Sequence, residues 1–303
     1  MYNSNPLVSV CIVTYNAVEF IEDTILSVLN QNYNNIEIAI SDDGSKDGTQ
    51  EILLKYSAQF PEKLKINLNL INKGITKNSN DALRMCTGKY ITLLGGDDLY
   101  LPDKISTQVT FMESNLNCKI SYHNVEIFES STGKRLGLYN SFTRSKPYNG
   151  DVSHLLKSGC FSSACSVMLR KSALPTHGFN EKYPVASDYA LFVETLLSGG
   201  QINYIPKIMS KYRRHSNNIT TSGSPLYKQT LRDTLNFLND IIIDHPNLAS
   251  YALEGIGTAL RAMRKYNGTS YSNMLWNSFK LSPNEKSFIG LCLFFLSFGK
   301  IKI

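Results

Sequence analysis

The sequence lacks several features that would place it in other classes of protein. Its six cysteines include no CxxC pair and no group with zinc-ligand spacing, so neither a zinc module nor a disulfide scaffold is indicated. No apolar run approaches the ~18 to 20 residues needed to cross a bilayer, and residues 1–6 contain no secretory apolar stretch. No long run of Lys and Arg predicts a nucleic-acid partner. These absences favour a reducing, cytoplasmic location.

What is present is the composition of a globular protein. Of the 303 residues, 42% are hydrophobic and 18% are charged, which is enough apolar material for a substantial core. The length suits one large α/β domain with an appendage, or two smaller domains. The formal net charge of +6 is mildly basic and favours phosphate groups or an anionic lipid surface as partners.

Hydrophobic periodicity predicts alternating strands and helices in the N-terminal third of the chain. A continuous apolar run at 7–13 indicates a strand that is buried on both faces. The further predicted strands cover 36–40, 64–71 and 90–94, and the predicted helices cover 21–30, 49–56 and 80–86. Such alternation predicts a Rossmann-like α/β fold, with a mostly parallel central sheet and flanking helices.

The rest of the chain shows a less regular pattern. The predicted elements are shorter strands over 119–139, a strand at 165–169, and helices at 189–197, 226–243 and 248–265. A stretch rich in Ser, Asn, Thr and Gly at 216–225 predicts a loop or a domain boundary. We therefore expect one α/β domain over 1–220 and a C-terminal helical region over 221–303.

Polar clusters follow three of the predicted strands, at the point where each strand ends. They are Thr14-Tyr15-Asn16, Asp42 to Ser45, and Asp97-Asp98. In open α/β sheets, ligands bind beyond the carboxyl ends of the strands, so we expect these clusters to converge. Ordinary turns are the alternative, because Asp, Asn and Gly are common turn residues.

Asp97 and Asp98 are adjacent carboxylates that follow two glycines at a strand end. They would repel each other unless a cation or hydrogen-bond donors compensate them. Mg²⁺ and Mn²⁺ take oxygen ligands, often only one or two from protein, with phosphates and water completing the shell. The pair therefore predicts a divalent metal that carries a diphosphate, with a solvated turn as the alternative.

Two further carboxylates suggest recognition and catalysis. Asp43 ends a predicted buried strand and could accept a hydrogen bond from the imide N–H of uracil; a plain turn before the Asp47 helix cap is the alternative. Asp188 stands at a predicted helix start, where it could deprotonate a hydroxyl nucleophile as general base. A helix N-cap is the alternative for Asp188, because Asp often fills that position.

The segment Tyr212-Arg-Arg-His-Ser-Asn-Asn218 concentrates basic and polar side chains. Arg213 and His215 could clamp a diphosphate or complete a metal shell. A solvated basic loop would explain the same residues.

Taken in order, these segments resemble glycosyltransferase family 2 over about residues 7–220. The stretches that carry the likeness are Val8-Ser-Val-Cys-Ile-Val-Thr-Tyr-Asn16, Gln31, Glu37-Ile-Ala-Ile-Ser-Asp-Asp-Gly-Ser45, Asp47-Gly-Thr49, Asn72-Lys-Gly74, Asn80, Gly88-Lys-Tyr-Ile91, Gly95-Gly-Asp-Asp98, Gly178-Phe-Asn-Glu181, Ser187-Asp188 and Tyr212-Arg-Arg-His215. Each is weak alone, but the ordered series is specific. The resemblance implies a GT-A fold and an inverting transferase of bacterial surface-polysaccharide (O-antigen or capsule) biosynthesis. It would use a nucleotide-sugar donor, a UDP-sugar by the Asp43 argument, and a glycan or undecaprenyl-diphosphate-linked saccharide acceptor.

The resemblance also carries roles to single positions. The donor-binding residues that it implies are Thr14, Tyr15, Asn16, Asp43, Lys73, Lys77, Asp97 and Arg213. Asp98 would bind Mn²⁺ or Mg²⁺ with His215 as a second contact, and Asp188 would be the catalytic base.

Two positions depart from the family pattern. Many members carry Asp where Gly95 stands, which could weaken metal binding, and Ser187 replaces a common acidic residue before the base. A second hypothesis is therefore a catalytically silent nucleotide-sugar or glycan-binding module, which turnover of donor would distinguish. A glycoside hydrolase with two carboxylates is a third, and it would leave the Asp43 cluster unexplained.

Residues 286–300 form a short apolar stretch flanked by lysines. The stretch is too short to span a bilayer, but it could lie in a membrane interface or pack as a core helix. Membrane contact would suit a lipid-linked acceptor and would place the protein peripherally on the inner face of the plasma membrane.

Overall fold

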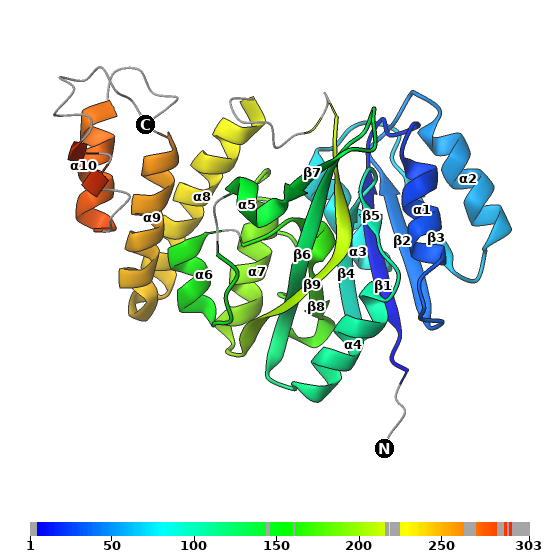
Figure 1. The fold of residues 1–303 in the computed structure, drawn as a ribbon, viewed down its shortest axis with the longest axis horizontal. Coiled ribbons are helices and arrows are strands. Elements are labelled where there is room, and N and C mark those ends of the chain that lie inside the picture. The colour runs from blue at the N-terminus through cyan, green and yellow to red at the C-terminus, as the bar shows by residue number, and fades with distance from the viewer. Residues whose placement is uncertain are drawn as a thin grey trace.

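A mixed sheet flanked by helices forms the centre of the computed structural model (Figure 1). The structure describes residues 5–143, 146–159, 161–215, 218, 225–263, 271–283, 288–289 and 291–292. In the order of strands β3-β2-β1-β4-β8-β6-β9-β5, each strand is hydrogen-bonded to its neighbours, and β7 pairs with β6 outside this path.

The N-terminal part alternates strands and helices as the sequence predicts. Its elements are β1 (Val8–Thr14), α1 (Ile21–Leu29), β2 (Ile36–Asp42), α2 (Thr49–Gln59), β3 (Leu64–Leu68), α3 (Ile75–Met85) and β4 (Tyr90–Gly95). The four strands are parallel. The bounds of β3 and α3 differ from the prediction, because β3 ends at Leu68 and α3 begins at Ile75, directly after Gly74 at φ +90°. The polar first turns of α3 gave no apolar periodicity from which to recognise them.

The remaining elements add parallel and antiparallel strands to the sheet, together with further helices. They are β5 (Leu99–Tyr100), α4 (Lys104–Ser114), β6 (Cys118–Glu129), β7 (Arg135–Leu138), α5 (Tyr139–Thr143), α6 (Val152–Ser158), η1 (Ala164–Ser166), β8 (Met168–Arg170), η2 (Lys171–Ala173), α7 (Ser187–Leu197), β9 (Gln201–Arg214), α8 (Pro225–Asp244), η3 (Pro246–Leu248), α9 (Ala249–Met263) and α10 (Tyr271–Leu281). The strand predicted at 165–169 is instead η1 followed by the short β8.

Strand β8 sets the direction of the second half of the sheet. It is antiparallel to both β4 and β6, and β6 is parallel to β9. The carboxyl ends of β6 and β9 therefore lie at the same edge as those of β1, β2 and β4. The end of β9 also pairs with β5, with Leu99 opposite Lys211, which brings the residues after β9 alongside Asp97 and Asp98.

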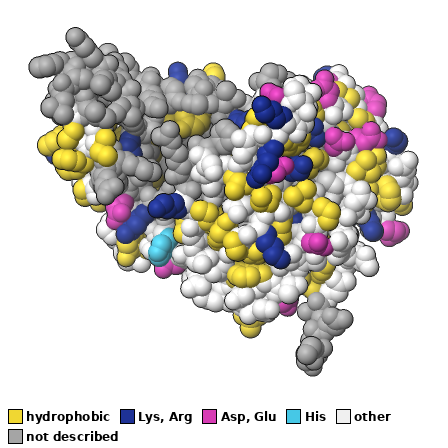
Figure 2. Space-filling view, in the orientation of Figure 1, with side chains coloured by type: hydrophobic (Ala, Val, Ile, Leu, Met, Phe, Trp, Pro, Cys, Tyr) yellow, Lys and Arg dark blue, Asp and Glu magenta, His cyan; other side chains and the backbone are white. Residues whose placement is uncertain are grey.

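Apolar clusters fill the space on the two faces of the sheet. One cluster packs α1, α2 and α4 against the sheet, and the other packs α3, α7, α8 and α9. The ring of Phe237 in α8 lies 5.1 Å from that of Tyr183 and 5.7 Å from that of Tyr189, so α8 shares a core with the start of α7. On the face in Figure 2, acidic side chains gather over α1 and α2, and basic ones over the upper ends of β6, β7 and β9.

The C-terminal region was expected to be helical, and α8, α9 and α10 are helices. Its separation from residues 1–220 as a domain stays a prediction, and the predicted boundary between 220 and 221 lies outside the described residues. Most of the segment 286–300 also lies outside them. Within the described residues, no helix is both long enough and apolar enough to cross a membrane.

Candidate active site

The ends of β1, β2 and β4 meet around Thr14. The Asp43 N–H donates to the Thr14 carbonyl at 3.0 Å, and the Gly96 N–H donates to the Val13 carbonyl at 2.9 Å. A Cβ on Gly96 would lie 2.5 Å from Thr14 Oγ1, so only glycine fits this approach. The three polar clusters that the sequence places after these strands therefore lie side by side.

The hydroxyl group of Thr14 is buried and unpaired within the described residues. Thr14 is 4% exposed, and its Oγ1 has no hydrogen-bond partner among the described residues. A buried hydroxyl usually finds a partner, because leaving it unpaired costs free energy. Thr14 Oγ1 is therefore a polar atom to which a bound ligand could supply the missing partner.

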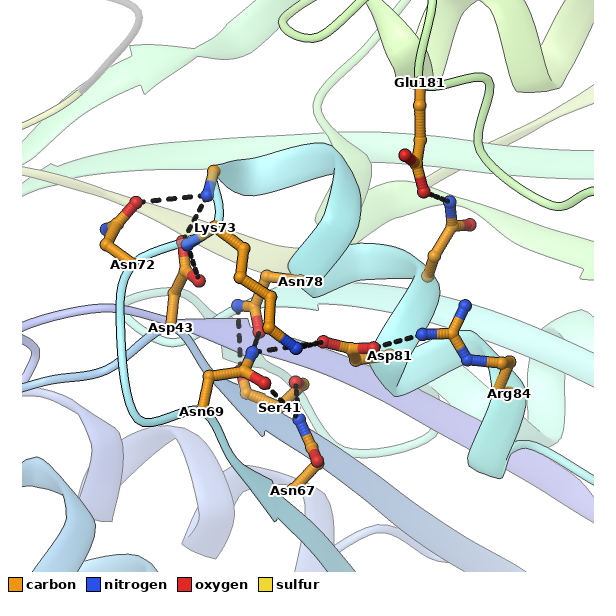
Figure 3. Close-up of polar contacts among 12 residues, drawn as sticks. Ser41, Asp43, Asn67, Asn69, Asn72, Lys73, Asn78, Asp81, Arg84 and Glu181 are labelled. Atoms are coloured by element: carbon orange, nitrogen blue, oxygen red, sulfur yellow. Dashed lines mark hydrogen bonds and ion pairs between the residues drawn. The ribbon is translucent and has the colours of Figure 1, made fainter.

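Asp43 is held by backbone amides rather than by a cation. Its two carboxylate oxygens accept the N–H groups of Lys73 at 2.7 Å and Gly74 at 3.0 Å (Figure 3). The ammonium of Lys73 turns away to Asp81 at 3.2 Å. Lys77 is exposed on α3. The contact that Lys73 makes with the site is thus through its backbone.

An asparagine network supports the segment that holds Asp43. Asn78 Nδ2 donates to the Ser41 carbonyl at 3.0 Å, and the Asn69 amide donates to Asn78 at 3.3 Å and to Asp81 at 3.1 Å (Figure 3). This network could not be predicted from the sequence, because isolated asparagines carry no periodic signal.

Tyr15 and Asn16 occupy the turn after β1. Tyr15 is 51% exposed, so its ring is available to a flat ligand. Asn16 adopts φ +49°, its N–H donates to Ser45 Oγ at 2.8 Å, and its side-chain oxygen accepts the Lys46 N–H at 3.1 Å. Asn16 thereby joins the turn after β1 to the turn after β2.

Asp98 carries a buried, poorly compensated charge. The residue is 4% exposed, and Oδ1 accepts the Arg213 N–H at 3.0 Å. Burial, with the adjacent charge of Asp97, raises the pKa of the Asp98 carboxyl well above its ordinary value, and the hydrogen bond from Arg213 opposes this only in part. A cation at this carboxylate would stabilise its ionised form.

His215 contacts Asp97 rather than Asp98. Its Nε2 lies 2.9 Å from Asp97 Oδ2, and its ring lies 4.7 Å from the ring of Phe20. Asn218, the last part of this segment that the structure describes, donates to the Arg213 carbonyl at 3.1 Å. Ser216 and Asn217 lie outside the described residues.

Arg213 is buried at the end of β9, which excludes a solvated loop for this residue. Its Nε donates to the Asp97 carbonyl at 2.8 Å, and the guanidinium pairs with Asp23 at 3.1 Å. The rings of Phe20 and Phe128 lie 5.0 Å and 4.9 Å from it. These contacts make Arg213 a brace for the backbone of Asp97 and Asp98, and its contact with a diphosphate stays a prediction.

Asp188 lies in the first turn of α7, one residue beyond a position docked on α3. Ser187 Oγ lies 2.8 Å from Thr76 Oγ1, and Asp233 of α8 accepts the Val185 N–H at 2.8 Å. The helix N-cap is Ala186, so the cap alternative for Asp188 is wrong. Burial raises the pKa of the Asp188 carboxyl, which makes it a stronger base than an exposed aspartate.

Comparison with known proteins places this geometry in a family. Residues 9–175 match the family described as "Glycosyl transferase family 2". An uncharacterized glycosyltransferase of Haemophilus influenzae is 30% identical over 261 residues, which cover 82% of this chain and 79% of that protein. The chain belongs to glycosyltransferase family 2. The resemblance inferred from the sequence is confirmed.

A further relative and a solved structure also resemble the chain over most of its length. The Escherichia coli protein WfaP, a UDP-Glc:alpha-D-GlcNAc-diphosphoundecaprenol beta-1,3-glucosyltransferase, is 30% identical over 82% of this chain and 94% of its own. The crystal structure of S. aureus TarS 1-349 in complex with UDP-GlcNAc matches with a TM-score of 0.67 at 16% identity, over 91% of this chain and 82% of that chain. The expected GT-A fold is confirmed.

Family 2 and GT-A glycosyltransferases typically depend on a divalent metal. A mannosyltransferase of Pyrobaculum calidifontis in complex with GDP-Man and Mn²⁺ matches this fold with a TM-score of 0.59 at 16% identity, over 96% of this chain and 84% of that chain. In the described residues of this glycosyltransferase, no three His, Cys, Asp or Glu side chains converge as a metal cage. Asp98 and His215 would supply only two ligands, and Mg²⁺ or Mn²⁺ can take the rest from phosphates and water.

Gly95 stands where many members of the family carry Asp. A Cβ at this position would lie 2.8 Å from Asp97 Oδ1. A larger residue at position 95 would therefore require the Asp97 carboxylate, the mobile end of its side chain, to shift.

A cavity of about 400 Å³ lies away from this site, at the amino edge of β6 and β9. Its lining includes Asn117, Gly200, Gln201 and His245. It contains none of the residues predicted to bind donor, metal or acceptor.

Proposed function

We propose that this protein transfers a sugar from a UDP-sugar to a hydroxyl of an undecaprenyl-diphosphate-linked saccharide, with inversion at the anomeric carbon. This reaction would serve surface-polysaccharide synthesis, of O-antigen or capsule. The observation that carries the proposal is the meeting of Thr14, Asp43, Asp97 and Asp98 at one sheet edge, beneath the end of β9. The activity for which WfaP is named supports the donor and the lipid-linked acceptor.

The nucleoside would lie between the turns after β1 and β2. Asp43, whose carboxylate two amides fix in place, is suited to accept the imide N–H of uracil. Tyr15 would stack on the base, and Thr14 Oγ1 would gain the partner that it lacks. Asn16 would keep the two turns together.

The diphosphate would lie beside Asp97 and Asp98. Mn²⁺ or Mg²⁺, held by Asp98 with His215 as the second contact, would supply positive charge to the leaving group when bound. Asp97 orients the His215 ring through its 2.9 Å contact. The ammonium of Lys77 is exposed at the start of α3, and Lys73 and Arg213 would act mainly through the backbone segments that they hold.

Asp188 would act as the general base. Its carboxylate takes the proton of the acceptor hydroxyl as that oxygen forms its bond to the anomeric carbon. The bond from the anomeric carbon to the diphosphate oxygen breaks in the same step, and the nucleoside diphosphate leaves with the electron pair. One base is sufficient, because an inverting displacement forms no covalent enzyme intermediate.

Calorimetry with UDP, GDP and TDP, followed by transfer assays with UDP-sugars and a lipid-diphosphate saccharide, tests the proposal. We expect UDP to bind most tightly and label to move from the donor to the acceptor. GDP or TDP binding at least as tightly as UDP would contradict the role of Asp43. UDP-sugar binding with no turnover on any acceptor would favour the silent binding module.

A further inference from the structure

One face of helix α8 holds the segment that leads into the proposed catalytic base. Asp233, Phe237 and Asp240 follow one another at spacings of four and three residues, so they share one face of this helix. Figure 1 shows α8 beside α7, and this face of α8 contacts 182–189, the segment that enters α7 and contains Asp188. The C-terminal helical region thereby reaches the backbone next to the proposed base.

Asp233 contacts the backbone of this segment. The residue is 2% exposed, and its Oδ2 accepts the Val185 N–H at 2.8 Å and the Ala186 N–H at 3.4 Å. Its Oδ1 accepts the side-chain amide N–H of Gln229 at 2.7 Å. Ala186 is the N-cap of α7 and has no side-chain oxygen with which to cap the helix. A buried carboxylate of another helix therefore fixes the chain two residues before Asp188.

A second helix, α3, holds the same segment. Thr76 Oγ1 donates to the Pro184 carbonyl at 2.7 Å and lies 2.8 Å from Ser187 Oγ. Four consecutive residues, 184–187, are thus held in turn by α3, by α8 at two positions, and by α3 again. The position of Asp188 depends on these contacts, because it is the next residue along the chain.

Asp240 lies two turns beyond Asp233 on α8 and contacts side chains of the segment instead of its backbone. It pairs with the ammonium of Lys182 at 2.6 Å and accepts the hydroxyl of Tyr183. These residues are five or more positions before Asp188. Asp240 thus helps to dock the same segment on the same helix at a distance from the base, which makes it a matched control.

We propose that Asp233 is a positioning residue for the transfer reaction, and that it places Asp188 for proton removal by holding the Val185 and Ala186 N–H groups. The inference rests on the proposed role of Asp188 as general base. A displacement of about 1 Å in a reacting group can cost ~10²-fold in rate, so an anchor two residues from the base can strongly affect catalysis. Helix α8 then serves the reaction as well as the fold.

Variants of Asp233 test whether its hydrogen bonds carry this role. Asp233→Ala removes them, whereas Asp233→Asn can keep them, because both backbone donors share one oxygen and Gln229 can turn its amide oxygen toward the new N–H. At a temperature where all variants are folded by circular dichroism, Asp233→Ala should lower kcat about 10- to 100-fold with UDP affinity unchanged. Asp233→Asn and Asp240→Ala should keep most of kcat. If Asp233→Ala does not fold, Asp233→Ser takes its place, since its shorter side chain cannot span both N–H groups.

A double-mutant cycle with Asp188→Asn separates positioning from general support of the site. In that background the base is already absent, so Asp233→Ala should change the residual kcat by less than about twofold. An equal loss of kcat in both backgrounds would overturn the proposal. So would an equal loss in Asp240→Ala, a full loss in Asp233→Asn, or wild-type kcat in Asp233→Ala.

Hydrogen–deuterium exchange over 182–190 adds a readout that needs neither donor nor acceptor. Exchange should be faster in Asp233→Ala than in Asp240→Ala, because the first variant frees two backbone N–H groups. Transfer by the wild type with equal kcat in Asp233→Ala would overturn this inference and leave the proposed function intact. No transfer by the wild type on any acceptor would overturn both, and faster exchange in Asp233→Ala would then assign Asp233 to the fold alone.

Discussion

Glu37 in β2 and Asp98 in the turn between β4 and β5 are both buried carboxylates, but their surroundings shift their pKa values in opposite directions. The Glu37 side chain is 7% exposed, and it accepts hydrogen bonds from Lys65 at 2.7 Å, from Ser9 and from Thr87. Burial raises the pKa of Glu37, but these donors outweigh burial and lower the pKa to about 2. Burial and the neighbouring Asp97 instead raise the pKa of Asp98 well above its ordinary range.

The fold itself compensates the charge of Glu37, whereas full compensation of Asp98 would require a bound ligand. The neighbours of Glu37 compensate its charge inside the folded chain, at the end of the sheet where β2 begins. Asp98 lies at the opposite edge, where the Arg213 N–H, the Cys165 thiol and the Arg213 charge offset burial and the like charge of Asp97 only in part. A poorly compensated carboxylate at a sheet edge is typical of a site where the missing charge comes from a ligand.

The largest expected effect is on catalysis, and it comes from Asp188, a third carboxylate of raised pKa. Asp188→Asn should lower kcat by ~10² to 10⁴ while UDP affinity stays nearly unchanged, because Asn cannot take the acceptor proton. Asn can still accept the Tyr189 N–H that Asp188 holds at 2.7 Å, so the fold should survive. Steady-state kinetics and calorimetry on both proteins give the answer. A variant that keeps more than about a tenth of kcat removes Asp188 from the mechanism.

The sequence predicted that the strand ends near Asp98 meet, but it did not predict the neighbours of Glu37. Continuous apolar runs revealed β1, β2 and β4, and the polar residues at their ends do meet around Thr14. The network of Glu37 was missed, because Ser9, Lys65 and Thr87 are far apart in the chain. The brace of Arg213 was missed for the same reason, since it depends on Asp23 and on the path of β9. Hydrophobic periodicity reports which face is buried but not which distant side chains meet there.

The next effect concerns the charge of Asp98. Asp98→Asn should lower the Mn²⁺-dependent affinity for UDP about tenfold or more, because even indirect partners of a metal ligand cost that much. The free energy of unfolding should stay the same or rise, since the variant removes a charge beside Asp97. Calorimetry with Mn²⁺ and with chelator measures the UDP affinity, and urea titration measures the free energy of unfolding. Equal UDP affinity with and without chelator in the wild type would remove the metal role.

Glu37→Gln should show the reverse pattern. It leaves Lys65 without its ion pair and should lower the free energy of unfolding by about 1 to 3 kcal/mol, with UDP affinity unchanged. Because folding lowers the pKa of Glu37 from 4.5 to about 2, its contribution is complete above pH 4.5 and is lost as the pH falls toward 2. Urea titrations across this pH range should show a smaller acid loss in the variant. An identical pH dependence in both proteins would contradict the assignment of Glu37 as a structural charge.

The smallest effect compares two buried hydroxyl groups rather than two charges. Thr14 Oγ1 has no partner within the described residues, whereas Thr49 Oγ1 accepts the Ala17 N–H at 2.9 Å and donates to Asp47 at 2.6 Å. Thr14→Val deletes no hydrogen bond of the unliganded fold, so stability should hold. It deletes the bond proposed to the donor, so UDP affinity should fall by about 2- to 10-fold.

Thr49→Val is the matched control, because it deletes two bonds of the fold and none proposed to the donor. It should lower the free energy of unfolding by about 1 to 3 kcal/mol and leave the affinity of the folded protein for UDP in place. Thermal unfolding and calorimetry on the two variants separate a hydroxyl that serves the ligand from one that serves the fold. If Thr14→Val binds UDP as tightly as the wild type, the unpaired hydroxyl does not contact the donor, and Asp43 and Tyr15 must hold the nucleoside without it.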